Sequence, residues 1–130
     1  MARSRTRGSG LTRKERAQCR ALLEKARLEV LARIERHEAP SRQAPEPLPD
    51  EIDQASLETE TGVLLRILDK ERNLLREIER ALEKFGNGGY GICEGTGEPI
   101  EVKRLLVRPW ARYSVAFKEE LEVLERGYAR

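Results

Sequence analysis

Residues 51–85 read EIDQASLETETGVLLRILDKERNLLREIERALEKF, a segment without proline in which Gly62 is the only weak helix former of note. Its apolar side chains recur in alternating steps of four and three, with Glu71 as the one polar interruption: Leu64, Leu68, Leu75, Ile78, Leu82 and Phe85. This spacing is typical of a coiled-coil seam, the apolar stripe that one helix packs against another. The segment therefore predicts a helix of about 35 residues, on the order of 50 Å long.

A partner for this helix is expected on its N-terminal side. Thr12 and Glu15 form a helix-start signature, because each side chain can bond the other residue's backbone amide. Helical spacing then continues until the chain meets four prolines: Pro40, Pro45, Pro47 and Pro49. These prolines force a turn, after which Asp50 can cap the second helix. We expect an antiparallel coiled-coil hairpin over residues 11–85, with its tip at about 38–55.

The remainder, residues 86–130, is expected to form a smaller unit. The sequence GNGG at 86–89 ends the long helix. Residues 90–112, which we call the knuckle, are rich in turn residues, and a β-hairpin-like pairing is expected around residues 99–106. Helical spacing returns over residues 111–128. The predicted fold is therefore mainly α: a long hairpin, a small globular unit and a C-terminal helix.

The composition agrees with this arrangement. Of the 130 residues, 37% are charged, 38% are hydrophobic and 5% are aromatic, and the mean hydropathy is −0.65. Such a chain can fill a thin helical seam, whereas large nucleotide-binding and barrel folds are excluded by its length. No apolar run approaches the roughly 18 residues of a membrane span, so we expect a cytoplasmic protein without a membrane partner. Cys19 and Cys93 are expected to be free thiols in that compartment.

Charge is unevenly placed along the chain. The formal net charge is +2, but residues 2–16 hold six Lys and Arg side chains against Glu15 alone, so this segment stands at +5 and the remainder at −3. No aromatic side chain is interleaved with these cations. We therefore interpret residues 1–10 as a flexible, soluble basic tail in preference to a nucleic-acid arm, and we expect no direct sequence-specific DNA binding.

Three motifs resemble the DksA/TraR family. Residues 90–100, YGICEGTGEPI, followed by KRL at 103–105 and RP at 108–109, are similar to the zinc-finger knuckle of that family. Residues 50–55, DEIDQA, match its coiled-coil tip pattern Asp-x-x-Asp-x-Ala, and residues 69–74, DKERNL, resemble its second tip helix. Because all three motifs stand in the family's order, the resemblance covers most of the chain.

The zinc-type members of the family carry four cysteines around this knuckle, because four thiolates satisfy a tetrahedral structural zinc. The matching positions here are Cys93, Thr96, Ser114 and Phe117. One thiolate cannot hold structural zinc, so we expect that no metal is bound. Packing around Tyr90 and Phe117 is expected to take its place.

The resemblance implies a regulator that binds bacterial RNA polymerase, inserts its coiled coil into the secondary channel and modulates initiation, in the stringent response with the alarmone ppGpp. The tip positions match Asp50, Asp53 and Ala55, and we expect Asp53 and Ala55 to act on the polymerase. Without the resemblance, Asp50 and Asp53 would be interpreted as helix-capping and first-turn charges.

The family's contacts with ppGpp match Leu74, Arg108 and Lys118. Glu77, by contrast, stands where the family usually has a basic residue, and a carboxylate repels pyrophosphate. Without the resemblance, Arg108 and Lys118 could equally well be ordinary solvated charges on the surface. If ppGpp binds, Arg76 or Arg80 must supply the missing positive charge.

Two other classes of function stay open at this point. A Gre-like transcript cleavage factor would hold Mg²⁺ at its tip, but Ile52 separates the acidic residues here and Glu51 alone keeps this alternative open. A helical adaptor unrelated to transcription would use the hairpin only as a partner surface. We expect no catalytic residue and no enzyme activity, a monomer, and no chemistry for the lone His37.

Overall fold

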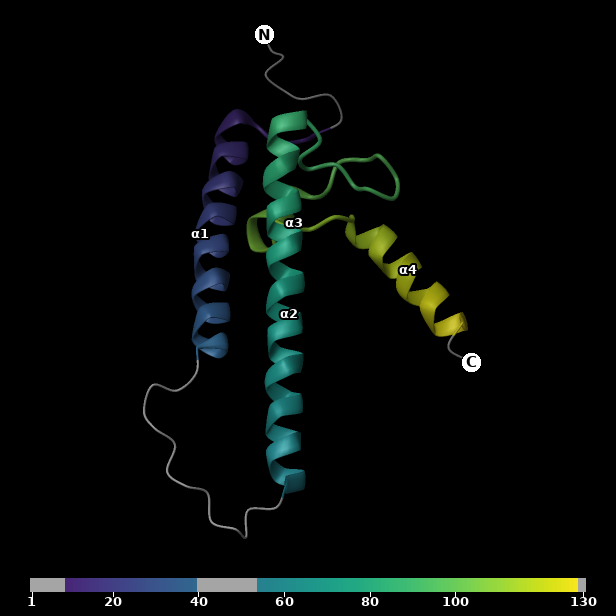
Figure 1. Ribbon diagram of the computed structural model, residues 1–130. Helices are drawn as coiled ribbons and strands as arrows, with labels where there is room; N and C mark the ends of the chain where they lie inside the picture. Colours follow the sequence, from purple (N-terminus) through teal and green to yellow (C-terminus); the bar gives the residue numbers. More distant parts are fainter. Residues whose placement is uncertain (1–8, 40–53, 129–130) are drawn as a thin grey trace.

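The computed structural model describes residues 9–39 and 54–128, and these ranges hold four α-helices in the order α1 (Arg13–Glu38), α2 (Gln54–Asn87), α3 (Val102–Val107) and α4 (Val115–Tyr128). Figure 1 shows α1 and α2 as a hairpin, with α3 and the loops of the knuckle gathered near the end where α1 begins and α2 ends. The described ranges contain no strand, apart from one isolated bridge. The mainly α fold class is confirmed.

α1 begins at the residue that its capping signature predicts. The hydroxyl of Thr12 accepts a hydrogen bond from the Glu15 amide (3.1 Å), and the carboxylate of Glu15 accepts one from the Thr12 amide (2.9 Å). These bonds satisfy amides that the first turn of a helix leaves without a partner. α1 then continues for 26 residues and ends at Glu38, just before Pro40.

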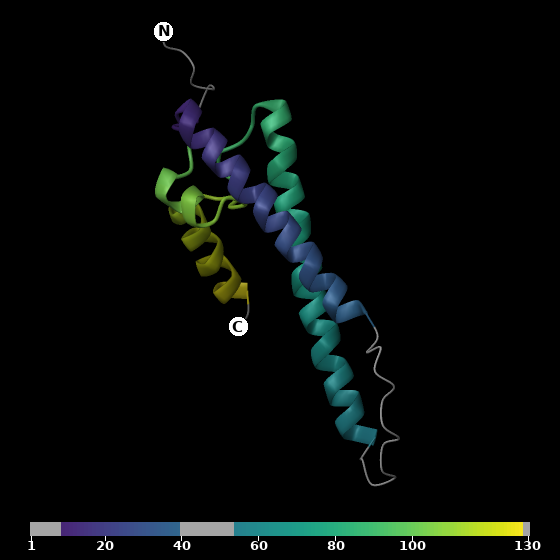
Figure 2. The ribbon, with the colours of Figure 1, turned by 90° about the vertical axis from the view of Figure 1, so that its left-hand side faces the viewer.

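α1 and α2 lie side by side and antiparallel (Figure 1, Figure 2). The side chains buried in the hairpin are Cys19, Leu23, Val30 and Ile34 of α1, and Leu68, Ile78 and Ala81 of α2. Two ion pairs cross between the helices, Arg27 with Glu79 (3.3 Å) and Arg33 with Glu71. Glu71, the polar interruption of the apolar repeat, therefore has a partner on the opposite helix. Each large buried side chain stabilises the hairpin by roughly 1.5–3 kcal/mol.

α2 extends beyond the end of α1 (Figure 1). Glu38, the last residue of α1, pairs with Arg72, so among the described residues no helix accompanies residues 54–67 of α2. Leu64 is 37% exposed, although the apolar repeat places it in the seam. The seam begins instead at Leu68, because α1 stops before the prolines and leaves nothing from α1 to cover the preceding turns.

The knuckle contains a helix where a β-hairpin-like pairing was expected. α3 occupies most of residues 99–106, so that expectation is wrong. Lys, Arg and Leu favour a helix in this run, and Leu105 is fully buried on it. Backbone pairing lies earlier in the chain, where an isolated antiparallel bridge joins Ile92 to Pro99.

The packed part of the chain begins before α1. Ser9 and Leu11 are 5% and 1% exposed, although Ser9 falls in the segment expected to be a flexible tail. Both residues approach Gly91 of the knuckle: a Cβ at Gly91 would lie 3.1 Å from Leu11 Cδ1 and 3.2 Å from Ser9 Oγ. Gly91 also has a φ of +87°, a conformation that favours glycine. The chain before α1 therefore packs against the knuckle.

α4 begins at Val115, later than the expected residue 111, because the Ser114 hydroxyl accepts a hydrogen bond from the Phe117 amide (3.3 Å) and caps the helix there. Within the described ranges α4 packs against no other helix. None of the described helices has the length and apolar character needed to cross a membrane.

Candidate functional site

The expected polymerase-acting tip is described only in part. Asp50 and Asp53 lie outside the described residues. Ala55 is exposed in the first turn of α2, where its carbonyl accepts a hydrogen bond from the Thr59 hydroxyl (2.8 Å). This start of α2 lies at the end of the hairpin remote from the knuckle (Figure 1). Ala55 therefore lies outside the seam.

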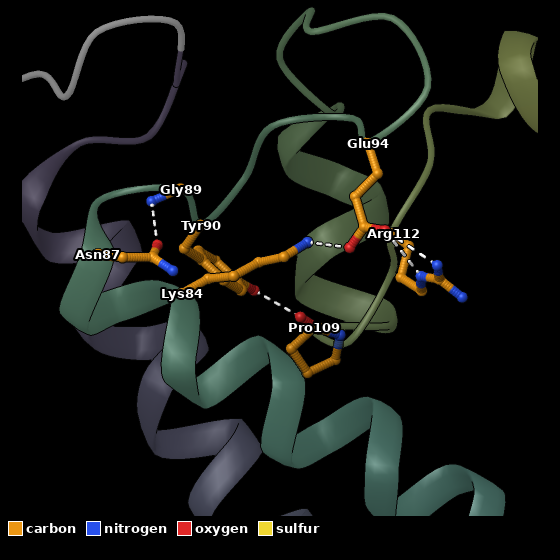
Figure 3. Close-up of polar contacts among 7 residues, drawn as sticks. All are labelled: Lys84, Asn87, Gly89, Tyr90, Glu94, Pro109 and Arg112. Atoms are coloured by element: carbon orange, nitrogen blue, oxygen red, sulfur yellow. Dashed lines mark hydrogen bonds and ion pairs between the residues drawn. The ribbon is translucent and has the colours of Figure 1, made fainter.

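At the other end of α2, an ion-pair network joins the hairpin to the knuckle. Glu94 of the knuckle pairs with Lys84 of α2 and with Arg112 (3.0 Å), as Figure 3 shows. The Glu94 amide also donates a hydrogen bond to the Arg112 carbonyl (2.8 Å). Burial opposes ionisation of Glu94, but the hydrogen bonds from Lys84 and Arg112 outweigh it and lower the pKa of its carboxyl. The knuckle is thereby held against α2 by a charge that persists at neutral pH.

Tyr90 is buried between the hairpin and the knuckle. Its ring stacks on Phe85 with the centroids 4.1 Å apart, and its hydroxyl donates a hydrogen bond to the Pro109 carbonyl (2.7 Å; Figure 3). Burial raises the pKa of Tyr90 well above its ordinary value, and the neighbouring Cys19 adds to this. Burial also raises the pKa of Cys19. Both Cys19 and Cys93 are free, as expected.

Three of the four positions that match zinc ligands meet around one sulfur atom. The buried Cys93 sulfur accepts hydrogen bonds from the Thr96 hydroxyl and from the backbone amides of Ser114, Thr96 and Gly95. Burial opposes ionisation of the thiol, but these bonds outweigh it and lower the pKa of Cys93 to about 7. The fourth position, Phe117, places its ring so close to Gly95 that a Cβ there would overlap it.

A surface groove of about 570 Å³ lies along α2 beside the segment that precedes α4. It is lined by Asn73, Arg76, Glu77, Glu79, Arg80, Glu83 and Arg112. Arg76 and Arg80, the two residues expected to offset Glu77, therefore share one groove with it, and Arg112 adds a third guanidinium. Guanidinium groups bind phosphate oxygens in bidentate fashion, so the groove offers suitable donors for a phosphorylated ligand.

The three residues expected to contact ppGpp do not line this groove. Leu74 is half-buried against the core of the hairpin. Arg108 is exposed directly after α3, and Lys118 is exposed in the first turn of α4. Arg112 was not predicted from the sequence, because its position depends on the long-range pairing with Glu94, which no local pattern reveals.

Comparisons with known proteins bear directly on this arrangement. Residues 15–85 match the N-terminal domain of the DnaK suppressor protein DksA, and residues 88–119 match the prokaryotic dksA/traR C4-type zinc finger. The first match alone covers more than half of the chain. This chain belongs to the DksA/TraR family. The resemblance stated from the three motifs is thereby confirmed.

Individual relatives of this DksA-family chain agree. The RNA polymerase-binding transcription factor DksA of Caulobacter vibrioides is 46% identical over 77 residues, which cover 59% of this chain and 54% of that protein. The protein of the same name from Escherichia coli K12 is 37% identical over 81 residues, covering 62% and 54%. The chain thus spans about half the length of the curated relatives it matches. Transcription factor DksA2 from Pseudomonas aeruginosa has a solved structure that is 41% identical, covers 88% of each chain and gives a TM-score of 0.74.

The zinc-finger match corrects one expectation. The loss of three cysteines led us to predict that no metal is bound, but the match of residues 88–119 to a C4-type zinc finger points to zinc binding, so that prediction is wrong. Cys93, with its lowered pKa, is the residue at these positions that suits a metal ligand. Thr96, Ser114 and Phe117 do not complete a four-cysteine set, and the described ranges contain no group of three or more His, Cys, Asp or Glu side chains placed to hold a metal ion.

Proposed function

We propose that this chain acts as a transcription regulator that binds bacterial RNA polymerase, as a monomer. The observation that carries the proposal is the match of residues 15–85 to the DksA N-terminal domain, the part of the chain that forms the hairpin. Relatives that share this region are named RNA polymerase-binding transcription factors. We therefore assign polymerase binding to the α-hairpin and not to a catalytic cluster.

The hairpin suits insertion into a narrow channel, and we infer that it enters the secondary channel of the polymerase. α2 alone has 34 residues, about 50 Å at 1.5 Å per residue. Among the described residues, its first turns have no neighbouring helix. Residues 50–65 contain five acidic side chains and no basic one. The proposed action is therefore delivery of Asp53 and Ala55 to the interior of the enzyme, where they modulate initiation.

Two acidic variants separate binding from action. Asp53→Asn is expected to abolish the effect on transcription in vitro while core polymerase is still retained in a pull-down, because the flanks of the hairpin supply most of the contact surface. Glu58→Gln, an exposed neutralisation one turn into α2, is the matched control and is expected to keep both properties. Parallel loss of binding and action in Asp53→Asn would mean that the tip is an anchor. Failure of the unmodified chain to bind core polymerase would refute the proposed function.

The groove on α2 supports ppGpp as a ligand shared with the polymerase. Arg76, Arg80 and Arg112 offset Glu77 in the groove, which Glu79 and Glu83 also line. The formal charge of the lining is therefore zero, and the guanidinium donors, not a net positive charge, support phosphate binding. Arg80→Gln is expected to weaken the response of transcription to added ppGpp, with little change in the response to the protein alone. Arg66→Gln, an exposed change on the same helix outside the groove, is the control. An equal ppGpp response in both variants would remove the groove from the ppGpp site.

A further inference from the structure

The side chain of Arg112 is held by a glutamate that is distant in sequence. Arg112 lies between α3 and α4, outside every described helix. Its Nε and Nη2 atoms both lie 3.0 Å from Glu94 Oε1, and its carbonyl accepts a hydrogen bond from the Glu94 amide (2.8 Å; Figure 3). Lys84 pairs with the other oxygen of the same carboxylate and thereby ties it to α2. One glutamate thus fixes an arginine from a loop beside α2.

The contacts with Glu94 leave part of the Arg112 guanidinium without a partner. Nη1 forms no hydrogen bond with any residue that the structure describes. Arg112 is nevertheless one of the residues that line the groove on α2. A guanidinium is planar and carries several N–H groups, so it can hold a carboxylate through one edge and offer its other donors to a phosphate oxygen. The pairing with Glu94 therefore keeps donors of Arg112 available to a ligand in the groove.

Glu94 competes for Arg112 with a carboxylate inside the groove. The hydrogen bond to Glu94 is the main cause that raises the pKa of Arg112, and attraction by Glu77, which lines the groove, adds to it. Without Glu94, an arginine on a loop would sample several side-chain conformations or pair with Glu77. In either case its donors would have to be reordered before they could bind a ligand, which costs affinity.

We propose that Glu94 is a positioning residue, which holds Arg112 at the groove so that its remaining donors bind a phosphate oxygen of the ligand. This inference rests on the proposed function, in which the groove takes ppGpp. The other two guanidinium groups of the groove need no such support from the knuckle, because Arg76 and Arg80 belong to α2 itself. A side chain that is already ordered loses less conformational freedom when the ligand binds.

Positioning and long-range electrostatics predict opposite results for the loss of Glu94. Since ppGpp is an anion, removing a nearby carboxylate should strengthen its binding if charge alone matters. If Glu94 positions Arg112, Glu94→Ala should instead raise the ppGpp concentration for half-maximal effect on transcription in vitro about 2–10-fold, the cost of ordering one long side chain. Glu83→Ala is the matched control, because Glu83 is an exposed carboxylate of the same groove that pairs with no described residue. It should leave this concentration unchanged or lower it.

Two further variants show whether Glu94 acts through Arg112. Arg112→Gln should raise the half-maximal ppGpp concentration about tenfold or more, because a hydrogen bond between charged groups is lost. Adding Glu94→Ala to Arg112→Gln should cause no further rise, since no guanidinium is left to position. Lys84→Ala removes the other cation bound to Glu94, so it should lower the melting temperature but leave the ppGpp concentration unchanged. If Glu94→Ala fails to fold, Glu94→Gln retains a neutral acceptor and should shift the ppGpp concentration in the same direction.

Three results would overturn this inference alone. The first is an unchanged or stronger ppGpp response in the folded Glu94 variant while Arg112→Gln responds weakly. The second is equal weakening by Lys84→Ala, which would mean that Glu94 acts by holding the knuckle on α2. The third is a further rise in the double variant. A normal response in both Arg80→Gln and Arg112→Gln would instead show that the groove is not the ppGpp site, and this inference would fall together with that part of the proposed function.

Discussion

The hairpin and the knuckle are stabilised by different kinds of contact. In the hairpin, several apolar side chains at regular spacing are buried in the seam and stabilise it together. Ile78 is one of them. In the knuckle, single contacts between residues distant in sequence hold the loops: Tyr90 donates to Pro109, and the Phe117 ring covers Gly95. The stability of the hairpin should therefore depend on how much apolar volume is buried in the seam. The stability of the knuckle should depend on the identity of a few individual residues.

The largest expected effect tests the hairpin. Ile78→Ala should lower the free energy of unfolding by about 2–5 kcal/mol, because it removes a side chain with no exposed surface from the seam. Leu64→Ala is the matched change on the same helix, at a position 37% exposed beyond the end of α1, and should cost less than about 1 kcal/mol. Urea unfolding followed by circular dichroism measures both. Equal losses would show that Leu64 belongs to the seam and that α2 is packed along its whole length.

Two glycine substitutions, one in each region, should change the free energy of unfolding in opposite directions. Gly95→Ala in the knuckle should lower the free energy of unfolding by about 1–3 kcal/mol, because the new Cβ overlaps the Phe117 ring. Gly86→Ala, in the last turn of α2, meets no atom within 4 Å and should raise it by about 0.5–1 kcal/mol, because alanine favours the helix. Thermal melts of both variants show whether each substitution stabilises or destabilises the protein. If both changes had the same sign, the two regions would not differ in the way proposed.

The same contrast explains which parts of the fold could be predicted from the sequence. The hairpin follows from local patterns: the Thr12 capping signature and the apolar repeat fix the start of α1 and the buried face of α2. Leu64 was misplaced because the repeat cannot tell where the partner helix stops. α3 was missed because turn residues surround a short run whose helical state depends on burying Leu105, a tertiary effect.

The candidate site was predictable to a similar degree. Arg76 and Arg80 were recognised as a source of positive charge because they flank Glu77 in sequence. Arg112 was not, since it joins the groove through Glu94 and Lys84, which come from other parts of the chain. The zinc prediction failed for a related reason: counting cysteines ignores the backbone amides that lower the pKa of Cys93, and it ignores the family pattern over residues 88–119.

The smallest expected effect concerns a single hydrogen bond between the two regions. Tyr90→Phe keeps the ring that stacks on Phe85 but leaves the Pro109 carbonyl without its donor, so near neutral pH it should lower the free energy of unfolding by about 1 kcal/mol. Tyr113→Phe, a change in a half-buried ring near Phe117, is the control and should be as stable as the unmodified chain at pH 8. Urea unfolding at pH 8, 10 and 11 measures all three proteins.

The way in which the stability deficit of Tyr90→Phe changes with pH is more informative than the magnitude of that deficit at neutral pH. Burial, with a contribution from Cys19, raises the pKa of Tyr90 above its ordinary value of 10.0, so above pH 10 the unfolded chain loses a proton that the folded chain retains. The stability gained from the neutral phenol is therefore complete below pH 10 and is lost as the pH rises, by about 1.4 kcal/mol for each pH unit. The phenylalanine variant has no such loss, so its deficit should shrink above pH 10 and disappear near pH 11. Parallel curves for the two proteins would mean that the phenol ionises in the folded state, and that Tyr90 is not sealed between the hairpin and the knuckle.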